Sequence, residues 1–271
     1  GGPITRDITG EENYSAIYSL RESKLKKGLI WVGSNDGPIH VTKNGGKKWI
    51  NVTPKDIDSG GRVDCVEPSV HKKSKAYVAI IRNQLGDSKP YIYRTTNYGK
   101  DWKLLTNGNN GIPSGYPTRV VLEDPEKEGV LYAGTEFGVF VSFNDGENWE
   151  PFQQNLPVTP VTDLKVYRGD LIISTMGRGF WILDNVSSLN ETNNIANDNH
   201  LFKPRDAFRY RYRASKGNSV PNYPGPSVIV DYYIKDSLDQ EISLNIKNQK
   251  DEIIYFVSSA KKDTASDQLD M

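Results

Sequence analysis

The sequence has few of the residues that metal and redox centres need: one cysteine and three histidines in 271 residues. A single cysteine cannot form an intrachain disulfide, and the alternating run RVDCVEP around Cys65 predicts a small buried core residue. His40, His71 and His200 are scattered, without cysteine partners or an i, i+4 pair. We therefore expect no metal site and no cofactor.

Excess charge of one sign and long apolar runs are missing as well. Lys+Arg and Asp+Glu are equal at 34 each, so no overall field favours nucleic acid or an anionic membrane. No stretch approaches the roughly 20 apolar residues of a membrane span, and no signal-peptide pattern is visible. We expect neither a nucleic-acid partner nor a membrane span.

Glycine, proline and tyrosine are abundant instead. The chain has 24 Gly, 15 Pro and 15 Tyr, a composition that favours many short strands joined by tight turns. The predicted fold class is therefore all-β. The length allows one large domain or two smaller ones.

One eight-residue motif, [Ser/Thr]-x-Asn-x-Gly-x-x-Trp, occurs three times. Its copies are TKNGGKKW (42–49), TTNYGKDW (95–102) and SFNDGENW (142–149), and their tryptophans are 53 and 47 residues apart. The motif positions are Thr42, Asn44, Gly46 and Trp49, then Thr95, Asn97, Gly99 and Trp102, then Ser142, Asn144, Gly146 and Trp149. Three short alternating segments precede each copy, which predicts four-stranded propeller blades. A fourth unit begins at VTDLKVY and stops before any motif.

The motif has a physical explanation as a hairpin turn between the third and fourth strands of a blade. Glycine supplies the positive φ that such a turn needs, and the hydroxyl and Asn side chains can bond the turn's own backbone. We expect each tryptophan to fold its ring under the turn and to bury about 150–250 Å² of aromatic surface.

These motifs resemble Asp-boxes, also called BNR repeats, with Asn44, Asn97 and Asn144 at the aspartate position. The spacing and the segment GDLIISTMGRGFWILDN are similar to secreted bacterial BNR propellers related to sortilin-type domains and to xyloglucan-cleaving endoglucanases. The resemblance covers roughly residues 1–186. It implies the C-terminal part of a larger propeller, with the remaining blades outside this chain, and a secreted, periplasmic or cell-surface location. In these families the Asp-box is structural and lies away from the active face.

The composition changes after residue 186. Residues 187–200 are polar and without periodicity, which predicts a linker. Residues 201–271 resemble a propeller-exit segment followed by an incomplete immunoglobulin-like sandwich, because three alternating segments are present where about seven strands are normal. RYRYR (209–213) is predicted to be a strand that covers the flank of the propeller.

The turns between second and third strands, and the links between blades, are expected to open onto one face, which is the usual binding face. Two interpretations of this face stay open. A glycoside hydrolase needs two carboxylates, for which Asp36 and Glu136 are the candidates, although both also fit as ordinary turn residues. A glycan- or peptide-binding module would instead use charged and aromatic side chains: Arg82, Asp87, Tyr116, Phe137 and Arg178.

The prediction we adopt is an extracytoplasmic binding or scaffold module, non-catalytic in this chain, that recognises a glycan or a protein ligand on the face opposite the Asp-boxes. The alternative is part of a glycoside hydrolase that acts on β-glucans.

Overall fold

The computed structural model describes residues 15–194, 198–207, 227–235 and 241–260. Most of this part forms antiparallel sheets in which each strand pairs with the next one along the chain. Blade 1 contains β1 (Ile17–Glu22), β2 (Ile30–Ser34), β3 (Ile39–Thr42) and β4 (Trp49–Asn51). Blade 2 contains β5 (Arg62–Pro68), β6 (Ala76–Ile81), β7 (Tyr91–Thr95) and β8 (Lys103–Leu104).

Blade 3 contains β9 (Thr118–Glu123), β10 (Leu131–Thr135), β11 (Gly138–Ser142) and β12 (Glu150–Pro151). Blade 4 has three strands in the described residues: β13 (Val161–Tyr167), β14 (Asp170–Thr175) and β15 (Phe180–Leu183). The repeated strand order and the shorter fourth unit are as predicted. The all-β class is therefore confirmed.

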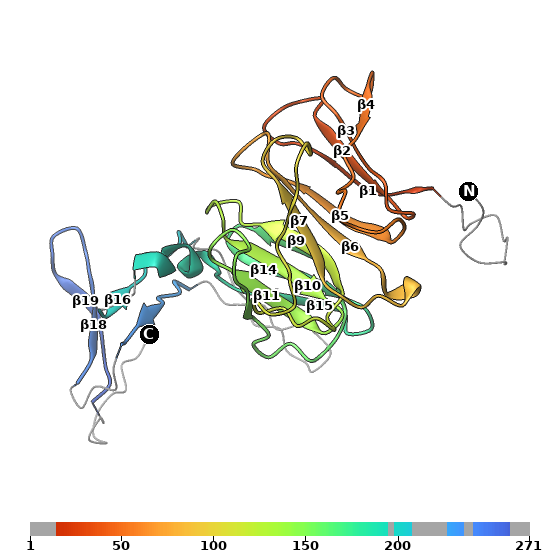
Figure 1. Ribbon diagram of the computed structural model, residues 1–271. Helices are drawn as coiled ribbons and strands as arrows, with labels where there is room; N and C mark the ends of the chain where they lie inside the picture. The colour runs from red at the N-terminus through yellow and green to blue at the C-terminus, as the bar shows by residue number, and fades with distance from the viewer. Residues whose placement is uncertain (1–14, 195–197, 208–226, 236–240, 261–271) are drawn as a thin grey trace.

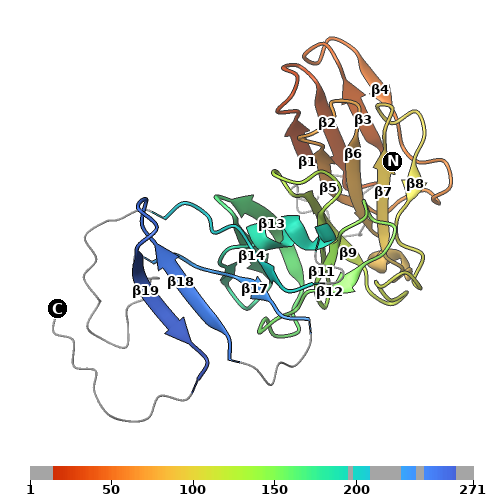
Figure 2. The ribbon, with the colours of Figure 1, turned by 90° about the vertical axis from the view of Figure 1, so that its left-hand side faces the viewer.

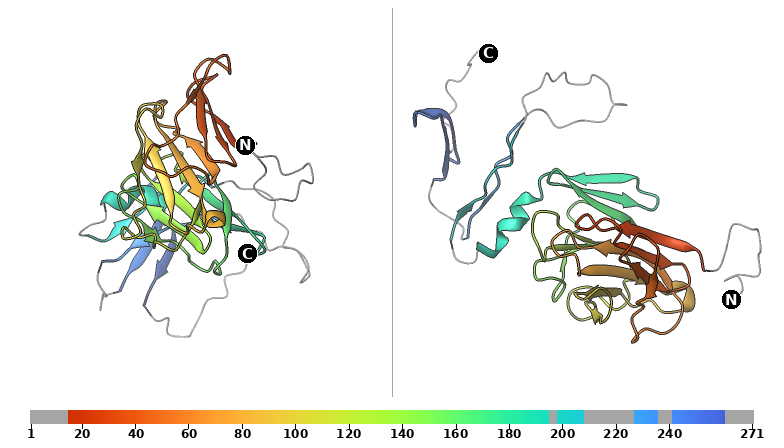
Figure 3. Two further views of the ribbon diagram at one scale, coloured as in Figure 1. Left: turned by 45° about the vertical axis from the view of Figure 1, so that its right-hand side comes forward. Right: turned by 90° about the horizontal axis from the view of Figure 1, so that it is seen from above.

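The four sheets pack side by side in chain order, as Figures 1 and 3 show. The first strands β1, β5, β9 and β13 contact one another in sequence, so they form the inner edge of the array. Two apolar clusters fill the junctions between sheets, one at blades 1 and 2 and one extending across blades 2 to 4. Blades 2 and 3 thus bury both faces against their neighbours, as a propeller requires, whereas blades 1 and 4 each keep exposed apolar residues on their outer side.

The turns of the three [Ser/Thr]-x-Asn-x-Gly-x-x-Trp motifs have the same internal hydrogen bonds. In the first, Thr42 Oγ1 donates to Asn44 Oδ1 (2.9 Å) and accepts from the Gly46 N–H (3.0 Å), while Asn44 Oδ1 accepts from the Lys48 N–H (2.9 Å). The equivalent bonds in the second and third turns are 2.9–3.1 Å long. All three motif glycines have positive φ, between 80° and 90°. The predicted turn chemistry is confirmed.

The three tryptophans do not share one environment, and here the prediction needs correction. Trp102 Nε1 donates to Val52 O (2.5 Å) and Trp149 Nε1 donates to Leu105 O (3.1 Å), each in the preceding blade. Trp149 is 3% exposed, whereas Trp49 is 41% exposed. The Trp102 and Trp149 rings therefore bond the preceding blade, whereas the Trp49 ring lies beside its own turn, where a methyl group on Gly46 would be 3.8 Å from Trp49 Nε1. For Trp49 the described residues contain no preceding blade.

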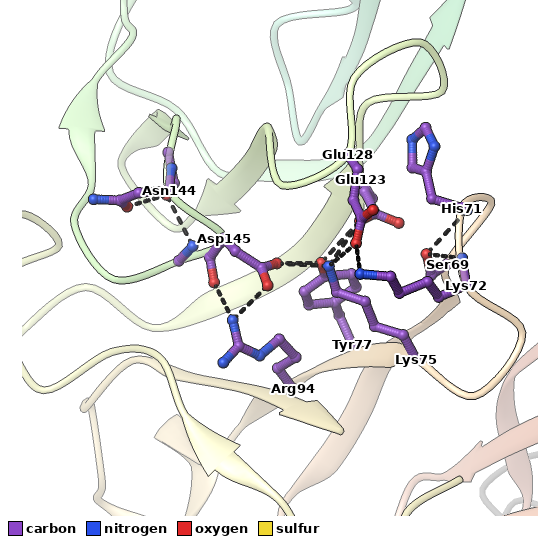
Figure 4. A network of polar contacts seen from close by, with 12 residues as sticks. Ser69, His71, Lys72, Lys75, Tyr77, Arg94, Glu123, Glu128, Asn144 and Asp145 are labelled. Atoms are coloured by element: carbon purple, nitrogen blue, oxygen red, sulfur yellow. Dashed lines mark hydrogen bonds and ion pairs between the residues drawn. The ribbon is translucent and has the colours of Figure 1, made fainter. Parts of the chain in front are cut away.

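A buried network of charges joins blade 2 to blade 3 (Figure 4). Lys75 Nζ lies 3.2 Å from Glu123 Oε1 and 3.0 Å from Asp145 Oδ1, and Lys75 is only 3% exposed. The Tyr77 hydroxyl lies between the same two carboxylates, while Arg94 Nη1 bonds Asp145 Oδ2 (2.5 Å). Burial and the adjacent carboxylates raise the pKa of Tyr77 above its usual value. Every positive group has a carboxylate partner, so the removal of one member would leave a buried charge unpaired at the junction.

The remaining described residues lie beside the stack of blades (Figures 1 and 2). The stretch predicted as a linker contains a 3₁₀ helix, η2 (Ser187–Asn194), whose Leu189 packs on the core of blades 2 to 4. Beyond it, β16 (His200–Leu201) pairs with β17 (Tyr232–Tyr233), and β18 (Ser243–Lys247) pairs with β19 (Ile253–Ser258). Two two-stranded sheets do not establish an immunoglobulin-like sandwich, which stays a prediction. RYRYR lies outside the described residues.

No helix in the described part of the chain is long and apolar enough to span a membrane. Cys65 is buried, as predicted, and burial raises the pKa of its thiol to about 12.

Candidate functional site

A β-bulge recurs near the start of the inner strand of every blade. The pairing between the first and second strands skips one residue in each sheet. The skipped residues are Tyr18, Asp64, Arg119 and Thr162. A bulge re-aims the side chain of the extra residue, and bulges are over-represented beside functional sites. The β-bulge is therefore repeated in each blade, while the residue whose side chain it re-aims differs from blade to blade.

Two of these bulge residues belong to a chain of ion pairs that ends at Glu136. Arg62 contacts Asp64, Asp64 Oδ2 lies 3.4 Å from Arg119 Nη1, and Arg119 grips Glu136 through Nε (2.7 Å) and Nη2 (2.5 Å). The hydrogen bond to Asp64 raises the pKa of Arg62 further, although burial opposes it. The Tyr18 ring covers the Arg62 guanidinium, 4.5 Å from the ring centroid. Glu136 is thus held in a fixed orientation at one end of the chain.

The predicted residues Glu136, Phe137 and Tyr116 come together on the turn face of blade 3. The Tyr116 and Phe137 rings are 4.6 Å apart between centroids and tilted by 50°. Phe137 remains 41% exposed and, with Glu136, lines a hollow of about 470 Å³ that is also bounded by Pro117 and Thr159. A half-exposed aromatic ring beside an oriented carboxylate is an arrangement suited to a sugar ring and its hydroxyl groups.

Asp36 is placed differently, in the β2–β3 turn of blade 1. It lines two smaller hollows of about 260 Å³ each, which also include Gly60 and do not include Glu136. Partial burial acts to raise its pKa, but hydrogen bonds from Ser15 and Ser34 outweigh this and lower the pKa of Asp36 below its usual value. A carboxyl group with a lowered pKa is suited to remain ionised and is a poor general acid.

Arg82 and Asp87 contact each other. Arg82 Nε donates to Asp87 Oδ2 (3.1 Å), and Arg82 Nη1 donates to the carbonyls of Asp58 (2.7 Å) and Gly60 (2.8 Å). Arg82 is 6% exposed. Tyr91 donates to Asp87 as well (2.7 Å). These contacts hold the loop between blades 1 and 2 in place.

Arg178 lies in the β14–β15 turn of blade 4, and its side chain is exposed. Its backbone N–H donates to Thr175 Oγ1 (3.1 Å), and its carbonyl accepts from Trp181 Nε1 (3.0 Å). The turn is thus ordered by local bonds that leave the guanidinium outside.

Three residues of this ion-pair chain were not predicted from the sequence: Arg62, Asp64 and Arg119. A signal for two of them was available: when the inner strands are aligned by repeat, Tyr18, Asp64, Arg119 and Thr162 fall in one column. The column holds four unlike residues, whereas the next positions along these strands are mostly apolar. The ion pairs between blades could not have been read from that column.

The similarity to known proteins is to propellers. A search with protein-family models finds no match. An oligoxyloglucan-reducing end-specific xyloglucanase from Emericella nidulans is 26% identical over 113 residues, which is 41% of this chain and 13% of that protein. A GH74 enzyme from Niastella koreensis superposes with a TM-score of 0.51 at 12% identity, covering 63% of this chain and 29% of that one.

A structure described as YCF48 bound to D1 peptide has a TM-score of 0.48 at 15% identity and covers 63% of this chain and 51% of that one. The chain thus spans 13% of the xyloglucanase and 29% of the GH74 enzyme that it matches. At such identities the likeness concerns the fold. The described residues 15–183 are blades of a β-propeller.

Proposed function

We propose that this chain is part of a glycoside-hydrolase-related propeller and that the turn face of blade 3 holds a β-glucan chain. The observation that carries the proposal is Phe137 beside Glu136 in the lining of one hollow, with the Tyr116 ring packed on Phe137 at 4.6 Å between centroids. Phe137 would stack on a sugar ring, and Glu136, fixed by Arg119, would accept hydrogen bonds from sugar hydroxyls. The similarity to xyloglucanase propellers favours this interpretation over a non-catalytic scaffold.

The proposal assigns binding, and not the whole reaction, to the described blades. Glycoside hydrolysis uses two carboxyl groups about 5–9.5 Å apart, one of them with a raised pKa. Asp36 and Glu136 line different hollows, and the pKa of Asp36 is lowered. The general acid would then come from blades outside the described residues. Because its substrate is a polymer, we expect such a protein to act outside the cytoplasm.

Isothermal titration calorimetry with a xyloglucan oligosaccharide tests the proposal. Phe137→Ala should weaken binding about tenfold, which corresponds to about 1.4 kcal/mol. Phe256→Ala is a matched control, because Phe256 is 56% exposed in the separate β18–β19 sheet. Equal affinity of Phe137→Ala and the unaltered chain would contradict the proposal. Binding of peptides and not of glucans would favour the protein-binding alternative.

The catalytic part is tested separately on the intact protein. Asp36→Asn and Glu136→Gln should each be assayed for β-glucan hydrolysis. We expect Glu136→Gln to raise KM, because it binds substrate, and Asp36→Asn to leave kcat nearly unchanged. A loss of kcat in both variants would instead make the two residues the catalytic pair.

A further inference from the structure

The junction of blades 1 and 2 has an open hollow on the Asp-box side of the molecule. Its volume is about 610 Å³, and its lining includes Ile50, Val52, Asp56, Lys100, Asp101 and Trp102. Trp102 is only partly buried here, although its indole N–H is bonded to Val52 O.

The junction of blades 2 and 3 shows how the same place can be closed. There Lys103 and Glu147 form an ion pair (2.5 Å) across the junction. Asn110 reaches in from the following loop and donates to Leu105 O (2.8 Å) and to Glu147 O (3.0 Å). The Asn110 carbonyl also accepts from the Trp149 backbone N–H (2.8 Å), and Ile112 packs in the same apolar cluster, so that Trp149 is 3% exposed.

The residues at the equivalent positions of the first junction cannot make that closure. Ile50 stands where blade 2 has Lys103, and Lys100 stands where blade 3 has Glu147. An isoleucine side chain cannot form an ion pair with a lysine. The hollow is therefore a property of this junction's sequence and is not a feature of every Asp-box.

The lining of the hollow indicates the class of ligand. Trp102 and Ile50 offer apolar surface, while the carboxylates of Asp56 and Asp101 and the ammonium group of Lys100 offer acceptors and donors at its edge. Lys55 also lines the hollow, so two lysines balance two aspartates. Balanced charge favours a neutral ligand, and an apolar face with peripheral hydroxyl groups describes a neutral pyranose ring.

We propose that this hollow is a second, separate binding site for a neutral saccharide, with Trp102 as its stacking surface. It lies at the Asp-box turns and so does not include Phe137 or Glu136. The inference does not depend on the function proposed for the blade 3 face. A protein with both sites would hold a polysaccharide at two places.

The sharpest test introduces the ion pair of the second junction into the first. The double substitution Ile50→Lys and Lys100→Glu places the Lys103–Glu147 pair at the first junction, on two exposed positions. Calorimetry of the full chain with a xyloglucan oligosaccharide should give two binding events for the unaltered protein and one for this variant. Unchanged thermal unfolding shows that the variant folds.

A tryptophan pair supplies the second test. Trp102→Phe should weaken the second event about tenfold, whereas Trp149→Phe should not, although both lose an indole hydrogen bond to the preceding blade. If the closing variant and Trp102→Phe bind as the unaltered chain does, the second site does not exist. If Phe137→Ala changes nothing while the closing variant abolishes binding, the second site stands and the function proposed for the blade 3 face fails.

Discussion

The motif turns of blade 1 (42–49) and blade 3 (142–149) have the same internal hydrogen bonds and different surroundings. Ser142 and Thr42 make the same bonds to Asn and Gly, yet Trp149 is buried and Trp49 is 41% exposed. A methyl group on Gly146 would lie 2.5 Å from Leu105 Cδ1, while on Gly46 it would meet nothing closer than 3.8 Å. The turn is therefore a local structure, and the tryptophan and glycine are contacts between blades.

The difference between the two turns indicates which contacts would cover the exposed face of blade 1. Val52 and Leu105 each follow the outer strand of a blade and present a carbonyl to the next indole and an aliphatic side chain to the next glycine. We expect Trp49 and Gly46 to receive the same two contacts from a preceding blade. That expectation agrees with the larger propeller that the sequence predicts.

The largest expected effect is the difference in unfolding free energy between substitution of Trp149 and substitution of Trp49. Trp149→Ala removes a buried ring and should lower the free energy of unfolding by about 3–5 kcal/mol. Trp49→Ala should cost less than about 1 kcal/mol, because its ring is half exposed. Urea denaturation of both variants measures the difference. Similar costs would mean that the two rings are equally packed in solution.

The charged network of blades 2 and 3 provides the next contrast. Lys75→Met leaves Glu123 and Asp145 without their shared cation, and breaking a buried pair in this way costs about 3 kcal/mol. Lys43→Met at the first junction removes a cation–π contact with Tyr98 and should cost about 0.5–1 kcal/mol. Thermal unfolding of both variants checks this. A larger loss for Lys43→Met would reverse the assignment of the stronger junction.

Glu67 gives the first junction a dependence on pH. Burial raises its pKa to about 7, although Arg21 across the junction (3.9 Å) opposes this. A carboxyl group whose folded pKa is above its unfolded value takes up protons on folding. Stability should therefore fall as the pH rises from about 4.5 to about 7, by about 2–3 kcal/mol.

Glu67→Gln should flatten this dependence and stabilise the protein at pH 8. The measurement is the free energy of unfolding between pH 4 and pH 8. A Glu67→Gln variant with the same pH profile as the unaltered chain would show that Glu67 is not the group that titrates.

The smallest expected effect is the difference in unfolding free energy between substitution of Gly146 and substitution of Gly46. Gly146→Ala strains a positive-φ position and drives a methyl group against Leu105, which should cost about 2 kcal/mol. Gly46→Ala has only the backbone strain and should cost about 1 kcal/mol. Denaturation curves for the pair isolate the contact with the preceding blade. Equal costs would indicate that Leu105 moves away without loss.

The same difference between local bonds and contacts between blades decides what could be predicted from the sequence. The blades and the motif turns were predictable because a hydroxyl, an amide and a glycine at fixed spacing bond one another locally. The exposure of Trp49 was not, since it depends on a neighbouring blade. At the candidate site, Tyr116, Phe137 and Glu136 were predictable as residues of two loops on one face. Their link through Arg119 and Asp64 was not, because ion pairs between blades have no local pattern.

Hydrogen exchange of the indole N–H groups tests most directly the conclusion that the motif tryptophans Trp102 and Trp149 dock on the preceding blade. In a ¹H–¹⁵N spectrum followed after transfer to D₂O, the Nε1–H signals of Trp102 and Trp149 should persist and that of Trp49 should vanish first. Exchange of Trp149 as fast as that of Trp49 would contradict the blade-to-blade bond and with it the explanation of the open edge.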